Sequence, residues 1–199
     1  MASVGSWEVK VSTSGMPQKI AEAFGRLGDL VGAEYQFVAY LGSQLVNGTN
    51  HAVLAEQTVI TGKDVKNVAL IILRETKEGV TITNIERVIE SGDELGGIKV
   101  DVTTDIPEEA QAAYDKTMEG HVGVSIKPFA FLATQVTEGT EYTFAAEISK
   151  VVRDPEPATV GLVTVNPMTK TVTVVPDILN KKQDEDGRLG YAFTWFRKK

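Results

Sequence analysis

The chain has 199 residues, of which 42% are hydrophobic and 24% are charged, and its formal net charge is -7 at pH 7. This balance is typical of a globular protein and excludes a disordered one. The excess of negative charge excludes broad binding to nucleic acid, and no apolar run is long enough to cross a bilayer. We therefore expect neither nucleic acid nor a membrane as a partner.

Cysteine is absent and the only histidines are His51 and His121. This excludes disulfides, thiolate metal sites, cysteine nucleophiles and a histidine-rich metal site. No glycine-rich loop lies between a strand and a helix, and no carboxylate has a recognisable acid–base partner, so we expect no enzyme, no metal and no cofactor. The first ten residues lack the apolar core of a signal peptide, so we expect a cytoplasmic protein unless a signal has been removed from the chain.

The first half of the chain predicts one helix among five strands. The helix is expected at 17–29, where Pro17 suits the first turn and Ile20, Phe24 and Leu27 share one side. A turn with Gly48 separates the two longest strands. The predicted strands, which alternate or are rich in β-branched residues, are 6–12, 34–46, 50–61, 68–75 and 81–89.

The second half repeats the first after a shift of 91 residues. Between 39–56 and 130–147, seven of eighteen aligned positions are identical, so the chain is a tandem duplication. The second helix is expected at 107–119. The corresponding strands are 97–103, 125–137, 141–152, 158–165 and 171–178.

Short connections favour an antiparallel meander with the helix packed across one face. We therefore expect an α+β fold of two tandem units, each with one helix on an antiparallel four- to five-stranded sheet. The expected domains are 1–92 and 93–180, joined by a linker at 90–97. Residues 181–199 form a tail whose sequence predicts one more strand at 190–196.

The first hairpin carries the sequence Gln44-Leu-Val-Asn-Gly48, which fits the pattern Gln-x-Val-x-Gly. This motif, within the order strand, helix and four strands, resembles the cystatins, which are protein inhibitors of papain-like cysteine proteases. The chain is especially similar to short bacterial cystatin-like domains, which carry Gly-Thr-Asn after the motif. Copy two matches in part, because Gln135 and Gly139 are in place but Thr137 replaces the valine. The resemblance implies two tandem cystatin-like units and a papain-like cysteine protease, or another protein, as the partner.

The resemblance also implies where a protease would bind. Cystatins enter the protease cleft with a wedge of three parts, namely a glycine-bearing N-terminal segment, the first hairpin and the last hairpin. The residues in these places are Gly5, Gln44, Leu45, Val46, Asn47 and Gly48 in copy one, and Gly96, Gly97, Gln135, Val136, Thr137, Glu138, Gly139, Pro167 and Met168 in copy two. The last hairpin of copy one, at 76–79, is charged and departs from the family pattern, in which Pro-Trp is frequent.

Such a wedge needs shape rather than catalysis. Gly48 would allow positive φ and bring the hairpin backbone close to the enzyme, while Leu45 and Val46 would lose water against the cleft walls. Plain structural roles compete with this interpretation, because any hairpin needs a turn glycine and Gln44 can bond within its own hairpin. His51 aligns with Tyr142 and is predicted to pack rather than to titrate.

Three functions remain open. The first is a reversible cysteine-protease inhibitor acting mainly through copy one, the second a non-inhibitory protein-binding module, and the third a structural component with exposed strand edges. The charged turn at 76–79 favours the second, whereas Gly5 and the intact motif at 44–48 favour the first, which we rank ahead. The target protease and the oligomeric state stay open.

Overall fold

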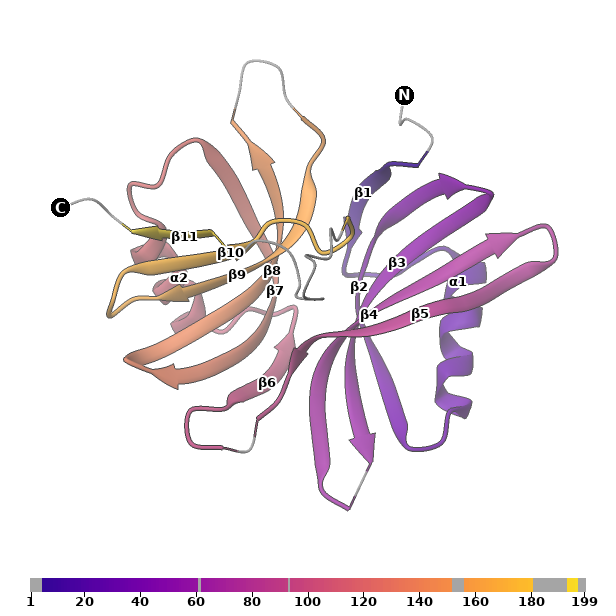
Figure 1. Cartoon of the computed structure of the whole chain (residues 1–199), viewed down its shortest axis with the longest axis horizontal. Coiled ribbons are helices and arrows are strands. Elements are labelled where there is room, and N and C mark those ends of the chain that lie inside the picture. The colour runs from indigo at the N-terminus through magenta and orange to yellow at the C-terminus, as the bar shows by residue number, and fades with distance from the viewer. Residues whose placement is uncertain (1–4, 61, 93, 152–155, 181–192, 197–199) are drawn as a thin grey trace, which may run out of the picture. The chain divides into compact units, whose positions relative to one another are not determined.

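Figure 1 shows the computed structural model of the chain, which describes residues 5–60, 62–92, 94–151, 156–180 and 193–196. The chain divides into two compact units, Met1–Ser91 (unit 1) and Gly92–Lys199 (unit 2). Of the expected tail 181–199, residues 181–192 and 197–199 lie outside the described residues. We describe each unit by itself.

Unit 1 is a five-stranded antiparallel meander in the order β1-β2-β3-β4-β5. Its elements are β1 (Trp7–Ser12), α1 (Gln18–Gly25), a 3₁₀ turn η1 (Arg26–Asp29), β2 (Ala33–Val46), β3 (Gly48–Ile60), β4 (Asp64–Thr76) and β5 (Gly79–Glu90). The expected helix at 17–29 is therefore an α-helix that tightens into a 3₁₀ turn over its last residues.

Unit 2 is a six-stranded antiparallel sheet in the order β11-β10-β9-β8-β7-β6. Its elements are β6 (Ile98–Thr103), α2 (Glu108–Met118), β7 (Val124–Thr137), β8 (Gly139–Lys150), β9 (Thr159–Asn166), β10 (Thr171–Val175) and β11 (Phe193–Phe196). The extra strand β11 pairs with β10, and no described strand pairs with the outer side of its counterpart β5. Strand β10 ends before Pro176, which has no N–H to continue the ladder, so the expected strand 171–178 is shorter than predicted.

The expected α+β fold class, with two cystatin-like units each built as a helix on a four- to five-stranded sheet, is wrong. The structure is mostly β, with 58% strand and only 14% helix. The reason lies in element length, because β2, β3, β4 and β5 have 12 to 14 residues each whereas α1 has eight. The α+β prediction counted one helix in each repeat but did not account for how short that helix is. The strands, which are rich in β-branched residues, are much longer.

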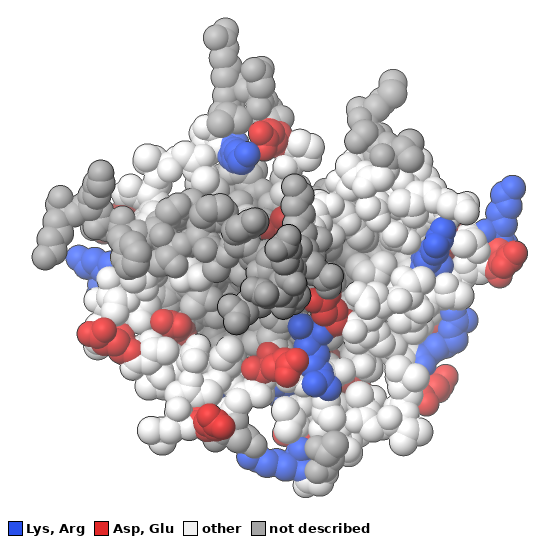
Figure 2. All heavy atoms as spheres, in the orientation of Figure 1, with Lys and Arg blue, Asp and Glu red and all other residues white. Residues whose placement is uncertain are grey.

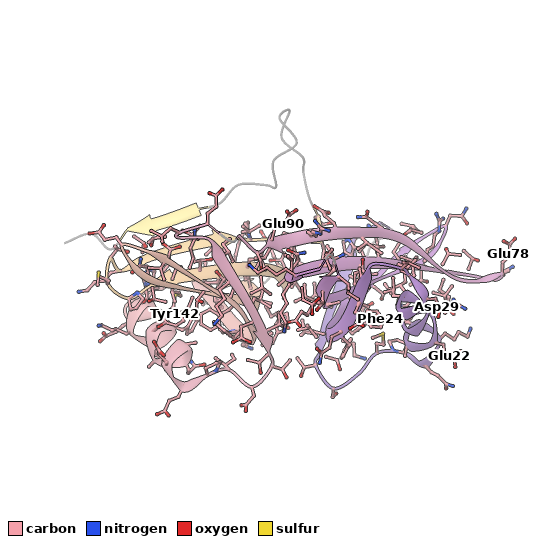
Figure 3. All side chains as sticks on the ribbon, turned by 90° about the horizontal axis from the view of Figure 1, so that it is seen from below. Glu22, Phe24, Asp29, Glu78, Glu90 and Tyr142 are labelled. Atoms are coloured by element: carbon pink, nitrogen blue, oxygen red, sulfur yellow. The ribbon has the colours of Figure 1, made fainter. Side chains whose placement is uncertain are left out.

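Each short helix contributes a few side chains to the core on one face of its sheet. In unit 1, Ile20, Ala23 and Leu27 are buried against β2, β3 and β4, and the ring of Phe24 meets Phe37 edge-on with centroids 6.4 Å apart. Figure 3 shows Phe24 on the side of the sheet that carries α1. In unit 2, α2 buries Ala110, Ala113 and Tyr114 in the same way. Most of either core nevertheless comes from the strands.

The meander fixes which loops meet. Val46 pairs with Gly48 at the tip of the β2–β3 hairpin, Thr49 pairs with Glu75, and Thr76 pairs with Gly79 at the tip of the β4–β5 hairpin. Both tips therefore lie at one end of the sheet, which we call the hairpin end of unit 1. The same register in unit 2 brings the turn after Thr137 beside the turn at 167–170, which defines its hairpin end.

On the face drawn in Figure 2, acidic and basic side chains are interspersed and form no broad basic area. Among the described helices, none is both long enough and apolar enough to span a bilayer.

Candidate functional site

The segment before β1 is fixed to the first hairpin of unit 1. The amide of Gly5 donates to the carbonyl of Leu45 at 2.9 Å, and the side-chain amide of Gln44 donates back to the carbonyl of Gly5 at 2.8 Å. Asn50 in turn donates to Oε1 of Gln44 at 3.0 Å, which orients the glutamine. The resemblance to the cystatins placed Gly5 and Gln44 in one candidate site, and the structure brings them into direct contact.

Unit 2 repeats this contact. Gln135 donates to the carbonyl of Gly96 at 2.8 Å, and Gly96 has φ +84° where Gly5 has φ +92°. Gly97, expected to share the role of Gly96, instead packs closely against the preceding turn. A Cβ at Gly97 would lie 2.2 Å from the carbonyl oxygen of Gly92, so a larger residue does not fit there. Gly96 is thus the counterpart of Gly5.

Gly48 has a different reason to be glycine from the one expected. Its φ of +98° suits a glycine, but the close approach is to its own sheet, because a Cβ at Gly48 would lie 2.5 Å from the carbonyl oxygen of Glu75. In unit 2, a Cβ at Gly139 would lie 2.9 Å from Cβ of Met168. Both glycines let the two hairpins of a unit pack together, so a substitution there tests the fold rather than a contact with a partner.

A side chain from the last hairpin holds the tip of the first one in both units. The guanidinium of Arg74 donates through Nε and Nη2 to the carbonyl of Asn47, with Nε at 3.1 Å. In unit 2, the amide of Asn166 donates to the carbonyl of Glu138 at 3.1 Å. Its Oδ1 also accepts the amides of Met168 and Thr169, at 3.0 and 3.2 Å.

Arg74 and Asn166 were not among the site residues predicted from the sequence. The signal was there, because each is a polar residue that ends an apolar run just before the last turn of its repeat. Asn47 and Glu138, by contrast, were expected in the site, and their carbonyls are the atoms that these side chains hold.

The hairpin ends display apolar side chains to solvent. Leu45 is 58% exposed and its repeat counterpart Val136 is 66% exposed, while Val46 is half-buried. Met168 is 69% exposed beside the half-buried Pro167, so the last hairpin of unit 2 is apolar at its tip. The tip of unit 1 carries the exposed Lys77 and Glu78 instead; Glu78 lies at the end of the β4–β5 hairpin in Figure 3.

Thr137, which replaces the motif valine in unit 2, has a partner for its hydroxyl. Its Oγ1 donates to Oε1 of Glu141 at 3.1 Å, and the residue is exposed. This side chain brings a polar, acid-bonded group to the place that Val46 occupies in unit 1.

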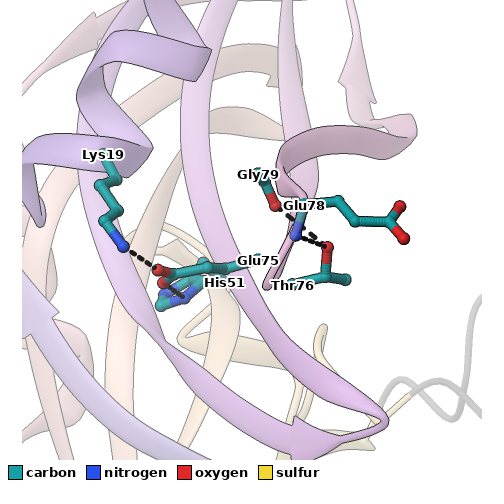
Figure 4. A network of polar contacts seen from close by, with 6 residues as sticks. All are labelled: Lys19, His51, Glu75, Thr76, Glu78 and Gly79. Carbon is teal, nitrogen blue, oxygen red and sulfur yellow. Dashed lines mark hydrogen bonds and ion pairs between the residues drawn. The ribbon is translucent and has the colours of Figure 1, made fainter.

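A polar network lies directly behind the hairpin end of unit 1 (Figure 4). Lys19 of α1 donates to Oε1 of Glu75 at 3.0 Å, and Nε2 of the buried His51 lies 3.4 Å from Oε2 of the same carboxylate. On the other side of the ring, the hydroxyl of Tyr40 lies 2.9 Å from Nδ1 of His51. The network connects the helix to β2, β3 and the end of β4.

The surroundings shift three pKa values in this network away from their ordinary values, two downward and one upward. Burial lowers the pKa of His51, and the nearby Glu75 carboxylate opposes this in part. The hydrogen bond from Lys19 lowers the pKa of Glu75. Burial raises the pKa of Tyr40. His51 is therefore predominantly neutral at pH 7, and its Nε2 makes no hydrogen bond with a described residue.

Unit 2 replaces this network with one contact. Tyr142, at the repeat position of His51, donates its hydroxyl to Oε1 of Glu109, which α2 supplies in place of Lys19. Burial and the adjacent Glu109 raise the pKa of Tyr142 to about 12. The position packs in both units, with an imidazole in unit 1 where unit 2 has a phenol.

A cavity of about 600 Å³ opens beside the network in unit 1. Its walls come from β1, the segment before α1 and the sheet; they are lined by Glu8, Lys10, Ser12, Ser14, Gly15, Met16, Pro17, Tyr40, Ser43 and His51. The hydroxyls of Ser12 and Ser14 lie 3.3 Å apart and bond to each other.

Among the described residues, no group of three or more His, Asp or Glu side chains could hold a metal ion. The hairpin ends present backbone, apolar side chains and a few charged side chains to solvent. Comparison with family models, with curated proteins and with solved structures found no match.

Proposed function

We propose that this chain is a reversible, non-covalent inhibitor of papain-like cysteine proteases, acting mainly through the hairpin end of unit 1. The observation that carries the proposal is the bonding of three segments into one surface. Gln44 fixes the segment at Gly5 to the first hairpin, and Arg74 fixes the first hairpin to the last. The motif at 44–48, by its resemblance to the inhibitory hairpin of cystatins, supplies the target class.

Rigidity is the physical basis of such inhibition. A surface that is already ordered loses little conformational entropy on binding, so a small contact can be tight. Leu45 stands exposed at the tip and would bury its side chain against a cleft wall. The surface would block the cleft by occupying it, with no covalent step.

Unit 2 would bind a cleft of different character. Its tip presents Val136 and Met168, both exposed, where unit 1 presents Leu45 beside the charged turn at 76–79. Thr137 and Glu141 add a hydroxyl and a carboxylate near this tip. We expect unit 1 to be the stronger inhibitor of papain, because binding would desolvate the polar pair in unit 2.

The test uses the full chain and substitutions that leave the fold intact. Leu45→Glu places a charge at an exposed tip and should weaken inhibition of papain at least about tenfold, as expected for loss of a well-packed contact residue. Val136→Glu reports on unit 2 in the same way. The matched control is Val31→Glu, because Val31 is fully exposed at the opposite end of unit 1.

Equal inhibition by wild type and Leu45→Glu would remove the hairpin end of unit 1 from the mechanism. No inhibition by the wild-type chain at micromolar concentration would exclude the proposal as a whole.

A second candidate function is a protein-binding module that does not inhibit, and one observation favours it. In each unit, a fully exposed valine lies at the end opposite to the hairpin end, Val31 in unit 1 and its counterpart Val122 in unit 2. Ile60 and its counterpart Val151 lie at the same end of their units and are partly exposed. Exposed aliphatic residues kept in both repeats are not needed by the core. If these two surfaces, one in each unit, carry the function, Val31→Glu with Val122→Glu abolishes partner binding while Leu45→Glu does not.

A further inference from the structure

A cavity of about 460 Å³ lies in unit 2 at the end opposite to its hairpin end. Strands β7 to β10, residues 156–157 and residues 176–177 supply its walls. Its lining residues are Val124, Ile148, Lys150, Glu156, Pro157, Thr159, Val174, Pro176 and Asp177. The cavity is separate from every residue assigned to the hairpin ends.

The floor of this cavity is part of the core. Ile148 and Val174 are 8% and 3% exposed and belong to the apolar cluster on the face that α2 covers, and Val124 packs against that cluster. The cavity is therefore a hollow in the hydrophobic core that opens to the surface, rather than a dent between polar side chains.

Unit 1 fills the same place with polar side chains. Gln57, the repeat counterpart of Ile148, lies in the ladder between Tyr35 and Asn67, as Ile148 lies between Ile126 and Thr159. Gln57 donates to the hydroxyl of Tyr35 at 2.7 Å and accepts from Asn67 at 3.2 Å. Arg87 also donates to Gln57, at 2.7 Å, so four strands are joined. The two repeats therefore differ at this position. In unit 1 it is filled by hydrogen-bonded polar side chains, and in unit 2 it is apolar and open.

The walls of the unit 2 cavity are held in place. Thr159 donates its hydroxyl to the carbonyl of Pro176 at 2.6 Å, which fixes the chain after β10. Glu156 is tied to the end of β8 by its ion pair with Lys150 at 2.7 Å. A Cβ at Gly161 would lie 2.5 Å from Cδ1 of Ile148, so this glycine makes room for the floor.

The charged groups at the rim already have partners. Lys150 is paired with Glu156, and the carboxylate of Asp177 accepts the amides of Leu179 and Asn180 at 2.9 and 3.0 Å. What the cavity offers to a ligand is consequently apolar surface in a preformed hollow, at a volume common for small-molecule sites. A charged ligand would lose its hydration there without gaining an unengaged counter-charge.

We propose that unit 2 carries a binding site for a compact, uncharged and mostly apolar small molecule, seated on Ile148 and Val174 between the two prolines. The site is independent of protease inhibition, since none of its residues lies at a hairpin end.

The probe for this site is 1-naphthol, with the anion 1-naphthoate as its charged counterpart. Binding to the full chain is followed by methyl NMR. We expect saturable shifts of the Ile148 and Val174 methyl groups and none of Ile71 and Leu73 in the core of unit 1. The naphthoate should bind at least about tenfold more weakly, because its carboxylate must be desolvated.

Val124→Trp should fill the mouth of the cavity and weaken 1-naphthol binding at least about tenfold. The control is Ala33→Trp, because Ala33 is the repeat counterpart of Val124. Each of the two is the first residue of the strand that follows the helix of its unit. The control should bind the probe as the wild type does. Absence of saturable shifts at Ile148 and Val174 in the wild type overturns the proposal even if Val124→Trp fails to fold, and so does stronger binding of the naphthoate.

Discussion

The side-chain amide of Gln44 donates to the carbonyl of Gly5 at 2.8 Å, and Gln135 makes the same bond to Gly96, also at 2.8 Å. Both bonds span 39 residues of sequence. The duplication has thus kept a contact that fixes the segment before the first strand to the first hairpin. In each unit, this contact joins the segment before the first strand and the first hairpin into one continuous surface.

Replacing the donor should release that segment. Gln44→Glu removes the donated hydrogen and places a carboxylate beside the carbonyl of Gly5, so the amide of Gly5 should exchange faster in hydrogen-exchange NMR. Loss of an exposed hydrogen bond of this kind is worth about 1 kcal/mol, which corresponds to about fivefold in exchange rate. Gln135→Glu serves as the control, since it should leave the exchange of Gly5 unchanged. Unchanged exchange in Gln44→Glu would show that the segment is held by other contacts.

Glycines at the two kinds of position should tolerate alanine differently. Gly48→Ala faces both a positive φ and the carbonyl oxygen of Glu75, whereas Gly5→Ala at φ +92° meets no atom within 4 Å. We expect a loss of unfolding free energy of at least about 2 kcal/mol for Gly48→Ala and about 1 kcal/mol for Gly5→Ala. Urea denaturation of the two variants gives the order, and equal losses would contradict the close approach of the hairpins.

The two residues that bridge the hairpins should differ in importance for stability. Asn166 is buried and makes three hydrogen bonds, while Arg74 is half-buried and holds a single carbonyl. Asn166→Ala should therefore cost about 2 kcal/mol of unfolding free energy and Arg74→Ala less than about 1 kcal/mol. Urea denaturation measures both, and a larger loss for Arg74→Ala would contradict this ranking.

Unit 1 should lose stability in mild acid through His51. Its pKa is lowered in the folded state from the ordinary value of 6.5, mainly by burial, so the unfolded chain binds the proton first as the pH falls. The favourable contribution of the neutral ring is complete above pH 6.5 and is lost as the pH falls from there through the folded pKa. The groups around the ring are Tyr40, Glu75 and, through Glu75, Lys19.

The measurement is a series of urea titrations between about pH 7.5 and about pH 5, followed through the Ile71 methyl group of unit 1 and the Val163 methyl groups of unit 2. The midpoint of unit 1 should fall with pH in the wild type and fall less in His51→Gln, which cannot gain the proton. Unit 2 has Tyr142 at this position and serves as the internal reference. If the urea midpoint reported by Ile71 changes with pH equally in the wild type and in His51→Gln, His51 is excluded as the cause.

The sequence by itself determined the duplication, the order of the elements and the positions of both helices. Periodicity placed Ile20 and Leu27 on one helix side, and the structure buries both. The resemblance to the cystatins, rather than periodicity, placed Gly5, Gln44 and Gly48 in one candidate site. The order of a meander then indicated that the first and last hairpins meet at one end of the sheet. These are local or topological properties, which survive in a linear pattern.

Tertiary structure alone decided the rest. The mostly β character depended on how far each strand stays paired, and β4 begins at Asp64, four residues before the apolar run that predicted it. The close approach of Gly48 to Glu75, the reach of Arg74 to Asn47 and the hollow above Ile148 each depend on residues distant in sequence. A pattern of residue types records which face a side chain takes, but its partners and the space around it are fixed only when the strands have packed.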